Sequence, residues 1–213
     1  MKKRPPAMFV ADAPGLDFLN TVAHPAKPIE WLSNGEDLLA WLEQAGMLAP
    51  ATAARMRADA EPEELDEIAA QARELREWFR GFVYRHKGGM LAEAALAELA
   101  PLNALLQNDE THRLVGVRTA AESEDTVSAL ERVTVRRWRS PATLLAPIAD
   151  ALPDLVCTAG FRQVKKCESP SCSLLFHDIT QGHARRWCSM ALCGNRAKQA
   201  AYRARIKQQA ATP

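Results

Sequence analysis

Four of the five cysteines in this chain of 213 residues lie close together, in the pattern C-x4-C-x15-C-x4-C. Zinc prefers four soft ligands at the corners of a tetrahedron, and two short turns that each carry two thiolates can supply them. Clustered cysteines in a reducing compartment indicate a metal rather than a disulfide framework. The pattern therefore predicts one structural Zn²⁺ ion, held by Cys167, Cys172, Cys188 and Cys193.

Four thiolates leave no open position for water on the metal, so the predicted site is structural rather than catalytic. A segment this small buries little apolar surface, and metal binding would contribute on the order of 10 kcal/mol to its folding. Two alternatives stay open at this point. One is four reduced, buried cysteines without a metal, and the other is a site in which His177 or His183 replaces one cysteine.

The residues around the ligands predict a small zinc-finger module. Pro170 and two serines favour a tight turn between the first two cysteines, and the flanking segments 161–165 and 173–177 are short and apolar enough to pair as a hairpin. Trp187 is expected to cover the metal cluster. Gly194 allows a close approach of the backbone or a positive φ, and Asn195 is expected to cap a final helix.

Charge is divided unevenly along the chain, although the net charge is only +1. Residues 161–209 contain ten Lys and Arg but only two acids, which gives this segment a net charge of +8. The rest of the chain has 17 basic and 24 acidic residues and carries −7. Such asymmetry indicates two roles on one chain, one of them with an anionic partner.

The segment after the last cysteine is rich in alanine, glutamine and arginine, which predicts a helix without a single acid. Guanidinium groups bind phosphate through paired hydrogen bonds, so nucleic acid, in particular duplex DNA, is the expected partner. The alternatives are a solvated basic face and a basic face that docks on the acidic N-terminal part. The candidate phosphate-binding residues are Lys165, Lys166, Arg185, Arg186, Arg196, Lys198, Arg203, Arg205 and Lys207.

Residues 1–160 predict a multihelical domain with a small β-hairpin. Ser33 or Asn34 is expected to cap a helix whose apolar residues recur at helical spacing and which Gly46 ends, and the same spacing recurs after Pro62. Further helices are expected from 16 to 21 with a stop at His24, Pro25 and Pro28, from 90 to 106 with a break near Pro101, and from 140 to a stop at Gly160. Valines that alternate with polar residues predict half-buried strands at 112–119 and 132–138. The expected fold class is mainly α, with domains at 1–160 and 161–213.

No transmembrane segment or signal peptide is expected, because the apolar runs are short and the stretch after the basic residues 1–4 meets Asp12 at once. We therefore expect a cytoplasmic protein.

Cys157 lies on an apolar helix face and is predicted to be a small core residue. Trp31, Trp41, Trp78 and Trp138 are expected to pack in the core rather than to line a ligand cavity.

Two segments resemble a known bacterial family. Residues 185–190 (RRWCSM) and 193–198 (CGNRAK), together with 176–178 and 202–205, resemble the C-terminal signature of the CGNR zinc-finger proteins. Residues 16–21 (LDFLNT) and 37–42 (DLLAWL) resemble the companion ABATE domain. The resemblance covers nearly the whole chain, and the four cysteines match the family's ligand positions. It implies a stress-related transcription regulator with a mainly helical N-terminal domain and a zinc finger that binds DNA.

Three classes of function are weighed from the sequence. The first is a DNA-binding regulator whose N-terminal domain senses a small-molecule effector or forms a homodimer. The second is a protein-interaction or RNA-associated module in which zinc only stabilises the fold. The third, an enzyme, is not expected, because no phosphate-binding glycine loop, HExxH or nucleophile elbow is present. Asp17, Asn20 and His24 lie close in sequence, but helix capping and turn formation are their expected roles.

Overall fold

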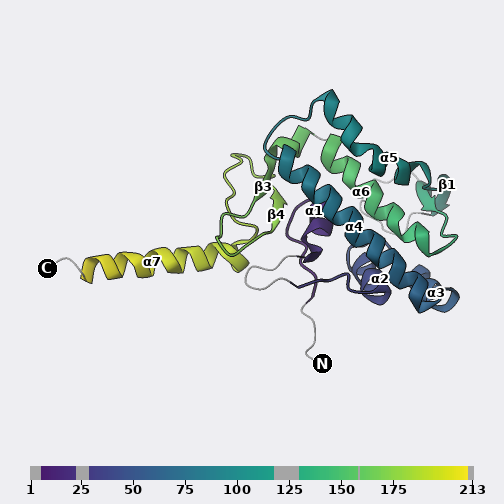
Figure 1. Ribbon diagram of the computed structural model, residues 1–213, viewed down its shortest axis with the longest axis horizontal. Helices are drawn as coiled ribbons and strands as arrows, with labels where there is room; N and C mark the ends of the chain where they lie inside the picture. The colour runs from purple at the N-terminus through teal and green to yellow at the C-terminus, as the bar shows by residue number, and fades with distance from the viewer. Residues whose placement is uncertain (1–5, 23–28, 118–129, 158, 211–213) are drawn as a thin grey trace.

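The computed structural model describes residues 6–22, 29–117, 130–157 and 159–210 (Figure 1). A body of packed helices carries the cysteine-rich segment at one end, and the last helix projects from that segment away from the body (Figure 1). The predicted stop of the first helix at His24, Pro25 and Pro28 lies outside the described residues, as does the basic start of the chain.

Helices dominate the described part of the chain, which confirms the predicted mainly α class. The body contains α1 (Pro14–Leu19), α2 (Gly35–Gln44), α3 (Pro50–Asp59), α4 (Pro62–His86), α5 (Ala100–Gln107) and α6 (Ala146–Cys157), with short 3₁₀ segments at Asn20–Val22, Glu93–Leu99, Pro141–Leu145 and Ala159–Gln163. Its two strands are β1 (Thr111–Val117) and β2 (Leu130–Arg136). The cysteine-rich segment contains β3 (Val164–Lys166), β4 (Leu175–His177), a π-helical turn at Met190–Gly194 and α7 (Asn195–Ala210). We call this segment, from β3 through the π-helical turn, the finger.

The start and stop signals explain where the helices begin and end. The Asn34 side chain accepts a hydrogen bond from the Asp37 N–H at 2.9 Å and caps α2, and Gly46 follows α2 with a φ of +69°. Pro62 lies in the first turn of α4, where its missing N–H costs nothing. Pro101 likewise lies in the first turn of α5, so the predicted break in a 90–106 helix is the beginning of α5 after a 3₁₀ segment.

The core of the body forms around α4, the longest helix. Its apolar face, including Ile68, Leu75 and Phe79, is buried against α1, α2 and the 3₁₀ segment before α6. Gly35 lets α2 approach closely, because a Cβ atom there would lie 2.3 Å from the Leu65 Cβ. The four tryptophans of the body contribute to this packing as predicted: Trp31 and Trp41 are buried, and Trp78 and Trp138 pack partly buried against the core.

Among the described residues of the body, one charged side chain is buried. Arg76 is only 3% exposed, and it donates hydrogen bonds of 2.7 Å to both carboxylate oxygens of Glu30. It also donates to Thr21 Oγ1 at 2.9 Å and to Glu77 at 2.8 Å. A buried guanidinium requires such partners, because an unpaired buried charge is strongly unfavourable.

The hairpin of β1 and β2 forms where the valine pattern predicted it, but its burial differs. The strands pair antiparallel, with Val115 opposite Arg132 and Val117 opposite Leu130. Val115 is 75% exposed and Val117 is 68% exposed, so the prediction that both are half-buried was wrong. Alternation requires one covered face, and none of the described residues covers the face on which these two valines lie.

A second correction concerns the end of the body. Cys157 is the last residue of α6 and is exposed, so the prediction that it is a core residue was wrong. The apolar face of α6 is formed by residues such as Ile148, Leu152 and Leu155 instead.

No described helix is both long and apolar enough to cross a membrane. The division into domains at 1–160 and 161–213 stays a prediction.

Candidate metal centre and basic helix

The four clustered cysteines converge on one point in the structure. Their Sγ atoms all lie within 4.8 Å of one another, and all four side chains are buried. Cys172 and Cys188 have their sulfurs 3.9 Å apart, and Cys188 and Cys193 have theirs 3.6 Å apart. Four sulfurs bound to one zinc at 2.3 Å would be separated by about 3.8 Å in a tetrahedron, whereas a disulfide needs about 2.05 Å. The cluster therefore fits one structural zinc ion.

Hydrogen bonds from the backbone N–H groups help to place three of the four ligands. Cys167 follows β3, and its N–H donates to the Leu174 carbonyl at 2.9 Å, while Cys172 closes a turn by donating to the Ser169 carbonyl at 3.0 Å. Cys193 lies in the π-helical turn, and its N–H donates to the Ser189 carbonyl at 3.0 Å. The sulfurs are thus fixed by a hairpin and by a capped turn, which is how a small module pre-forms a metal site.

Neither histidine takes the place of a cysteine. The group of potential ligands found among the described residues contains the four cysteines alone. His183 has its Nδ1 2.9 Å from the Asp178 carbonyl, and His177 packs its ring against Gly160, where a Cβ would lie 2.2 Å from Nε2. The alternative with a histidine ligand is therefore not supported.

The thiols compete for protons when no metal is bound. The pKa of Cys172 is lowered to about 5, first because Cys188 donates a hydrogen bond to its sulfur. The same contact, with the neighbouring negative charge, raises the pKa of Cys188, and burial raises that of Cys193. A divalent cation bound between the four sulfurs would lower the pKa of every thiol, because its charge stabilises all of the thiolates at once.

An apolar shell separate from the core of the body surrounds the cysteines. Leu174 and Phe176 are fully buried in it, and Met8, Val10, Trp187 and Leu192 pack against it from outside. Trp187 covers the cluster as predicted, and the Arg186 guanidinium lies 5.0 Å from the centre of its ring. The shell limits access of water to the sulfurs, which favours retention of the metal.

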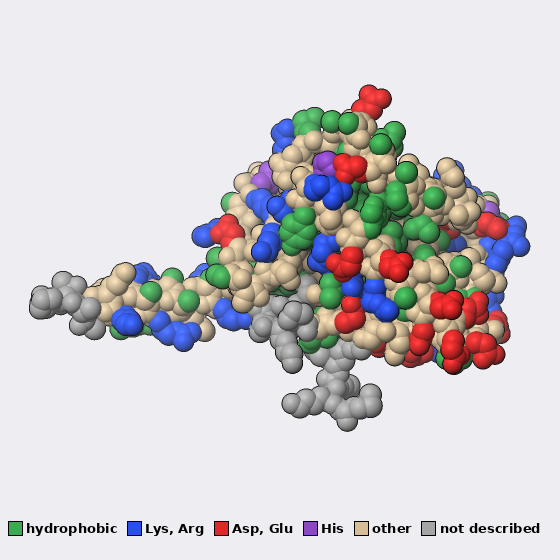
Figure 2. Space-filling view, viewed as in Figure 1, with side chains coloured by type: hydrophobic (Ala, Val, Ile, Leu, Met, Phe, Trp, Pro, Cys, Tyr) green, Lys and Arg blue, Asp and Glu red, His purple; other side chains and the backbone are tan. Residues whose placement is uncertain are grey.

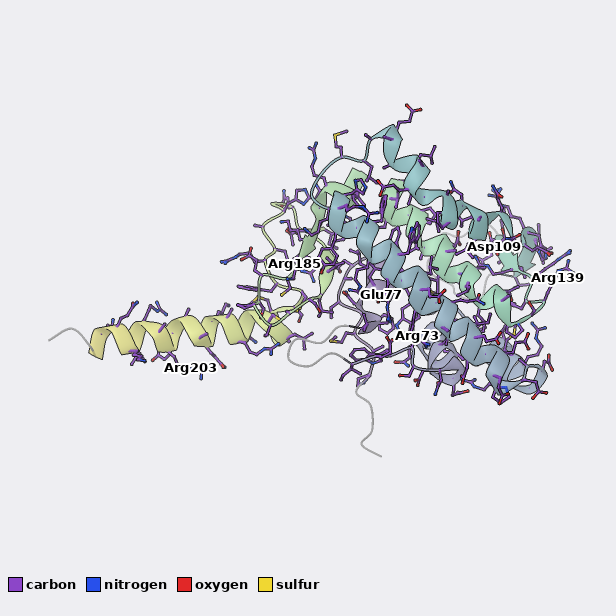
Figure 3. All side chains as sticks on the ribbon, viewed as in Figure 1. Arg73, Glu77, Asp109, Arg139, Arg185 and Arg203 are labelled. Carbon is purple, nitrogen blue, oxygen red and sulfur yellow. The ribbon has the colours of Figure 1, made fainter. Side chains whose placement is uncertain are left out.

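Arg185 joins the finger to the start of the chain rather than pointing into solvent (Figure 3). Its guanidinium contacts the Asp12 carboxylate, donates to the Val10 carbonyl at 2.8 Å and to the Cys188 carbonyl, and lies 4.4 Å from the Phe176 ring centre. Its backbone N–H donates to the buried Asp178 carboxylate at 2.9 Å. These contacts engage the Arg185 guanidinium within the protein, and its phosphate-binding role stays a prediction.

Lys165 is occupied in a similar way. Its ammonium donates to Asp178 at 2.7 Å and to the His183 carbonyl. Burial alone would raise the pKa of Asp178, but hydrogen bonds from Lys165, from Thr180 and from the Arg185 N–H outweigh burial and hold that pKa below its usual range. Lys165 and Arg185 thus neutralise and position a buried acid, and the phosphate-binding role of these two residues stays a prediction.

Two polar side chains, of Asp17 in α1 and of Asn20 directly after it, bind backbone groups. The Asn20 side chain donates to the Leu175 carbonyl at 2.8 Å and accepts from the Leu175 N–H at 3.0 Å, which attaches the helical body to β4. Asp17 accepts from the N–H groups of Val10 and Ala11, both at 3.0 Å and both at its Oδ1. Asp17 thus orders the turn before α1, whereas the capping role predicted for Asn20 was wrong, because its side chain binds β4 instead. His24 lies outside the described residues.

The basic helix α7 continues directly from the π-helical turn that contains Cys193. Ser189 caps this joined segment by accepting from the N–H groups of Ala191 and Leu192. Asn195 already has helical backbone angles, so the prediction that it caps the final helix was wrong. Gly194 has no positive φ, and the close approach is to Met190, whose sulfur would lie 2.5 Å from an added Cβ.

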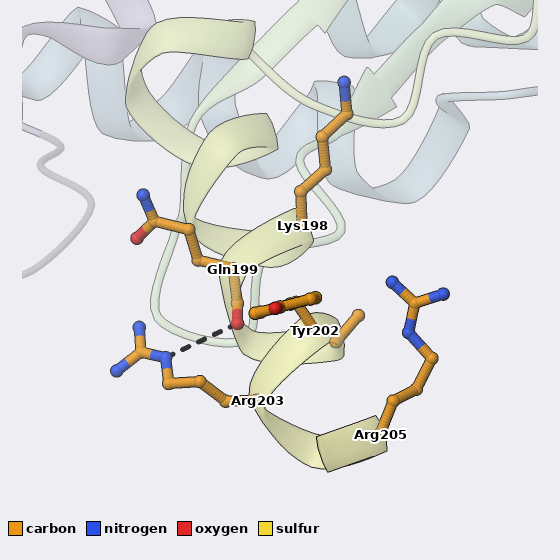
Figure 4. A pocket seen from close by; sticks show the side chains of 6 residues that line it. Lys198, Gln199, Tyr202, Arg203 and Arg205 are labelled. Carbon is orange, nitrogen blue, oxygen red and sulfur yellow. Dashed lines mark hydrogen bonds between the residues drawn. The ribbon is translucent and has the colours of Figure 1, made fainter.

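The side chains of α7 from residue 198 to 209 are all exposed. Tyr202 is 58% exposed and Ile206 is 47% exposed. Figure 4 shows Tyr202 on α7 with Lys198, Arg203 and Arg205 around it. Arg203 makes only a weak contact with the Gln199 carbonyl at 3.4 Å, whereas Arg196 contacts the Cys193 sulfur at 3.5 Å. Lys198, Arg203, Arg205 and Lys207 are therefore free to meet a partner.

The helix does not dock on the acidic part of the molecule. It projects away from the helical body, and its packing contact is with the π-helical turn (Figure 1). In Figure 2 the carboxylates gather at the end of the body where α2 and α3 lie, and Lys and Arg side chains lie along α7. The alternative in which the basic face is covered by the N-terminal domain is not seen in this structure.

Comparison with known proteins gives two matches that cover most of the chain. Residues 12–159 match the ABATE family model, which is described as a putative stress-induced transcription regulator. Residues 163–206 match the model of the CGNR zinc finger. No curated protein matches the chain. The resemblance drawn from the sequence motifs is thereby confirmed for both regions.

Proposed function

Because the chain belongs to the ABATE family and carries a CGNR zinc finger, we propose that it is a transcription regulator that binds duplex DNA. The observation that carries this proposal is the attachment of α7 to the zinc cluster. Cys193 is a metal ligand at the base of a helix whose cations are exposed and whose sequence contains no acid. Zinc would therefore present α7 in one defined orientation.

The exposed cations of α7, which are Lys198, Arg203, Arg205 and Lys207, would contact the phosphates of the DNA backbone. A helix of this diameter fits the major groove of B-DNA, and exposed Lys and Arg along it can reach the flanking phosphates. The N-terminal domain would act as the sensor of a stress signal, through a small effector or a homodimer, and would have no catalytic role.

The test is a titration of duplex DNA, followed by fluorescence anisotropy, at several salt concentrations. Arg203→Ala/Arg205→Ala should weaken binding about tenfold or more and reduce the slope of log K against log salt by about two, because each phosphate contact releases about one counterion. The variant keeps Arg196, which contacts the metal cluster, so zinc content should not change.

The matched control removes two arginines from the other region. Arg113→Ala/Arg132→Ala alters exposed residues of the β1–β2 hairpin, with the same change in net charge. If both double variants bind DNA equally, α7 is not the DNA-binding element. If the wild-type protein shows no binding at low salt, the proposal fails as a whole.

A second candidate function, a zinc-stapled module that binds a protein or an RNA, is favoured by one observation. Tyr202 and Ile206 lie four residues apart on α7 and are both exposed, so they form a small apolar stripe between the cations. Such a stripe can dock in a groove of a partner protein. Capture of one defined protein that survives nuclease treatment, and that is lost in Tyr202→Ala/Ile206→Ala, would favour this function over DNA binding.

A further inference from the structure

A basic cleft lies between the end of α4 and the finger, away from α7. Its volume is about 530 Å³, and it is lined on one side by Lys87 and Gly88 and on the other by residues of β3 and of the segment before Cys188. Gly88 has a φ of +78°, which turns the chain after α4 and places Lys87 at the rim. Five basic residues line this cleft: Lys87, Lys165, Lys166, Arg185 and Arg186.

Three of the five cations already have carboxylate partners. Lys165 pairs with Asp178 at 2.7 Å, Arg185 pairs with Asp12, and Arg186 pairs with Glu168 at 2.6 Å. Among the described residues, no carboxylate forms an ion pair with Lys87 or Lys166. The cleft therefore retains two positive charges that the described part of the protein does not balance.

The remaining donors suit one type of anion. Only the Nε of Arg186 is used by Glu168, so its two terminal nitrogens can still donate. Together with the ammonium groups of Lys87 and Lys166, they provide donors on both sides of the cleft. A phosphate monoester carries a charge close to −2 at neutral pH and presents three acceptor oxygens, which matches two unbalanced cations and a guanidinium edge.

We propose that this cleft binds the phosphate dianion of a small phosphorylated molecule. Its volume lies within the range of small-ligand pockets, so it has room for more than the phosphate group itself. The ligand would contact the helical body through Lys87 and the finger through Lys166 and Arg186. This site goes beyond the proposed DNA binding and does not depend on it, since none of its residues lies on α7.

A DNA phosphate is a less suitable occupant than a monoester. Each backbone phosphate is a diester with a single negative charge, so one of them would leave half of the charge of the cleft unbalanced. The free cations proposed to bind DNA lie along the projecting helix, whereas Lys87 lies on the helical body. DNA binding by the cleft is therefore treated as an outcome that would overturn the proposal.

The experiment is a calorimetric titration of the zinc-loaded full chain with adenosine 5′-monophosphate, with adenosine as the control that lacks the phosphate. We expect the monophosphate to bind and adenosine not to bind. Inorganic phosphate should displace the nucleotide, because it presents the same dianion. If inorganic phosphate alone binds as tightly as the nucleotide, the cleft recognises the free phosphate ion itself. That result would still support binding of a phosphate dianion in the cleft.

Two variants separate the cleft from α7. Lys87→Gln/Lys166→Gln should lower the affinity for the monophosphate at least about tenfold, since two charge-assisted contacts are lost, and should leave zinc content and helical circular dichroism unchanged. Arg203→Ala/Arg205→Ala should bind the monophosphate like the wild type. This second variant distinguishes the two proposals, because it should weaken DNA binding without changing any residue that lines the cleft.

Three results would overturn the proposal. The first is that neither the monophosphate nor inorganic phosphate binds at low ionic strength. The second is equal affinity of the wild type and Lys87→Gln/Lys166→Gln for the nucleotide. The third is a loss of duplex DNA binding in Lys87→Gln/Lys166→Gln without any competition by the monophosphate, which would make the cleft part of the DNA surface.

Discussion

The helical body and the finger are held together by different forces. In the body, buried side chains from helices distant in sequence form one continuous apolar cluster around α4. In the finger, the corresponding cluster contains little more than the four cysteines, Leu174 and Phe176. Burial of apolar surface is sufficient for the first region, whereas the second needs a metal–ligand contribution to remain folded. The stability of one chain thus depends on two unrelated kinds of interaction.

The contacts between the two regions are of a mixed kind. Val164 and Leu175 of the finger are buried in the apolar cluster of the body. Hydrogen bonds to backbone groups, from Asn20 to Leu175 and from Arg185 to Val10, and an ion pair between Arg185 and Asp12 add to this packing and fix the orientation of the finger. The comparison predicts that damage to one region will spread to the other only through this junction.

The largest expected effect is the loss of zinc from the finger. Cys172→Ser should abolish stoichiometric zinc binding, because a hydroxyl does not replace a thiolate in the tetrahedron, and should remove on the order of 10 kcal/mol of metal-binding free energy. The helices of the body should stay folded. Zinc release measured with a colorimetric chelator, combined with limited proteolysis, tests both parts of the prediction.

The control for this experiment is Cys157→Ser, which changes the exposed cysteine at the end of α6. It should retain zinc and resist protease like the wild type. Unfolding of the helical body together with the finger in Cys172→Ser would show that the two regions form one cooperative unit, contrary to the comparison.

The next effect is expected inside the helical body. Glu30→Gln leaves the buried Arg76 guanidinium without its main negative partner and should lower the free energy of unfolding by about 3 kcal/mol. Zinc content should not change. Urea unfolding followed by circular dichroism measures the loss.

An exposed ion pair provides the matched control for Glu30→Gln. Glu36 pairs with Arg57 at 2.8 Å, but its side chain is 62% exposed, so Glu36→Gln should cost less than about 1 kcal/mol. Equal losses for the two substitutions would mean that burial of Arg76 does not determine the strength of its ion pair.

The junction should show an intermediate effect. Asn20→Ala removes two hydrogen bonds to Leu175 and leaves its N–H and C=O groups with fewer partners, which should cost about 2 kcal/mol. Hydrogen exchange should become faster in β4 and on the adjoining face of α1. Asn108→Ala, at an exposed amide that donates to the Ala104 carbonyl, should change neither and serves as the control.

The smallest expected effect depends on pH. Burial raises the pKa of Asp17 from its usual value to about 6. A raised carboxyl pKa means that the folded state binds the proton more tightly, so this group lowers stability as pH rises from about 4 to about 6. Asp17 is only half-buried, and we therefore expect only about 1 kcal/mol.

Asp17→Asn should remove that dependence, because the amide oxygen can still accept both N–H groups that donate to Oδ1. The stability of the variant relative to the wild type, measured by urea unfolding with excess zinc, should rise between pH 4 and pH 6 and stay constant above. A constant difference across this range would contradict the shifted pKa.

Local signals in the sequence predicted the parts of the fold that local chemistry determines. Asn34, Gly46 and Pro62 mark helix ends because their effects act within one turn. The cysteine spacing predicted the metal centre because a tetrahedron of thiolates restricts the possible arrangements strongly. In these places the structure confirms the prediction almost residue by residue.

Contacts between distant residues could not be predicted in this way. Asn20 and Leu175 are 155 positions apart, and no pattern in either segment indicates the other. The occupation of Lys165 and Arg185 was missed for the same reason, although Asp178 offered a signal. A solitary acid in a strongly basic segment is a candidate for a buried acceptor, and the cations nearest to it are then not free.

Exposure was the other property that patterns did not determine. Alternating valines predicted the β1–β2 hairpin correctly, but burial of Val115 and Val117 would require a neighbouring element on that face. Cys157 is exposed at the last position of α6, although Leu155 and Val156 just before it still pack in or against the apolar cluster. In both cases the secondary structure was predictable and the packing was not.

Because α7 continues directly from the π-helical turn that contains Cys193, any rotation at the metal cluster turns the whole of α7 as one rigid arm. Cys193 lies within this turn, and the 16 residues of α7 extend the arm by about 24 Å. A rotation of about 10° at the metal cluster would displace the far end of the arm by about 4 Å, roughly the spacing of successive base pairs along a duplex. Small rearrangements of the junction with the helical body would thus be amplified at the tip of the arm, where its terminal cations would move from one phosphate to the next.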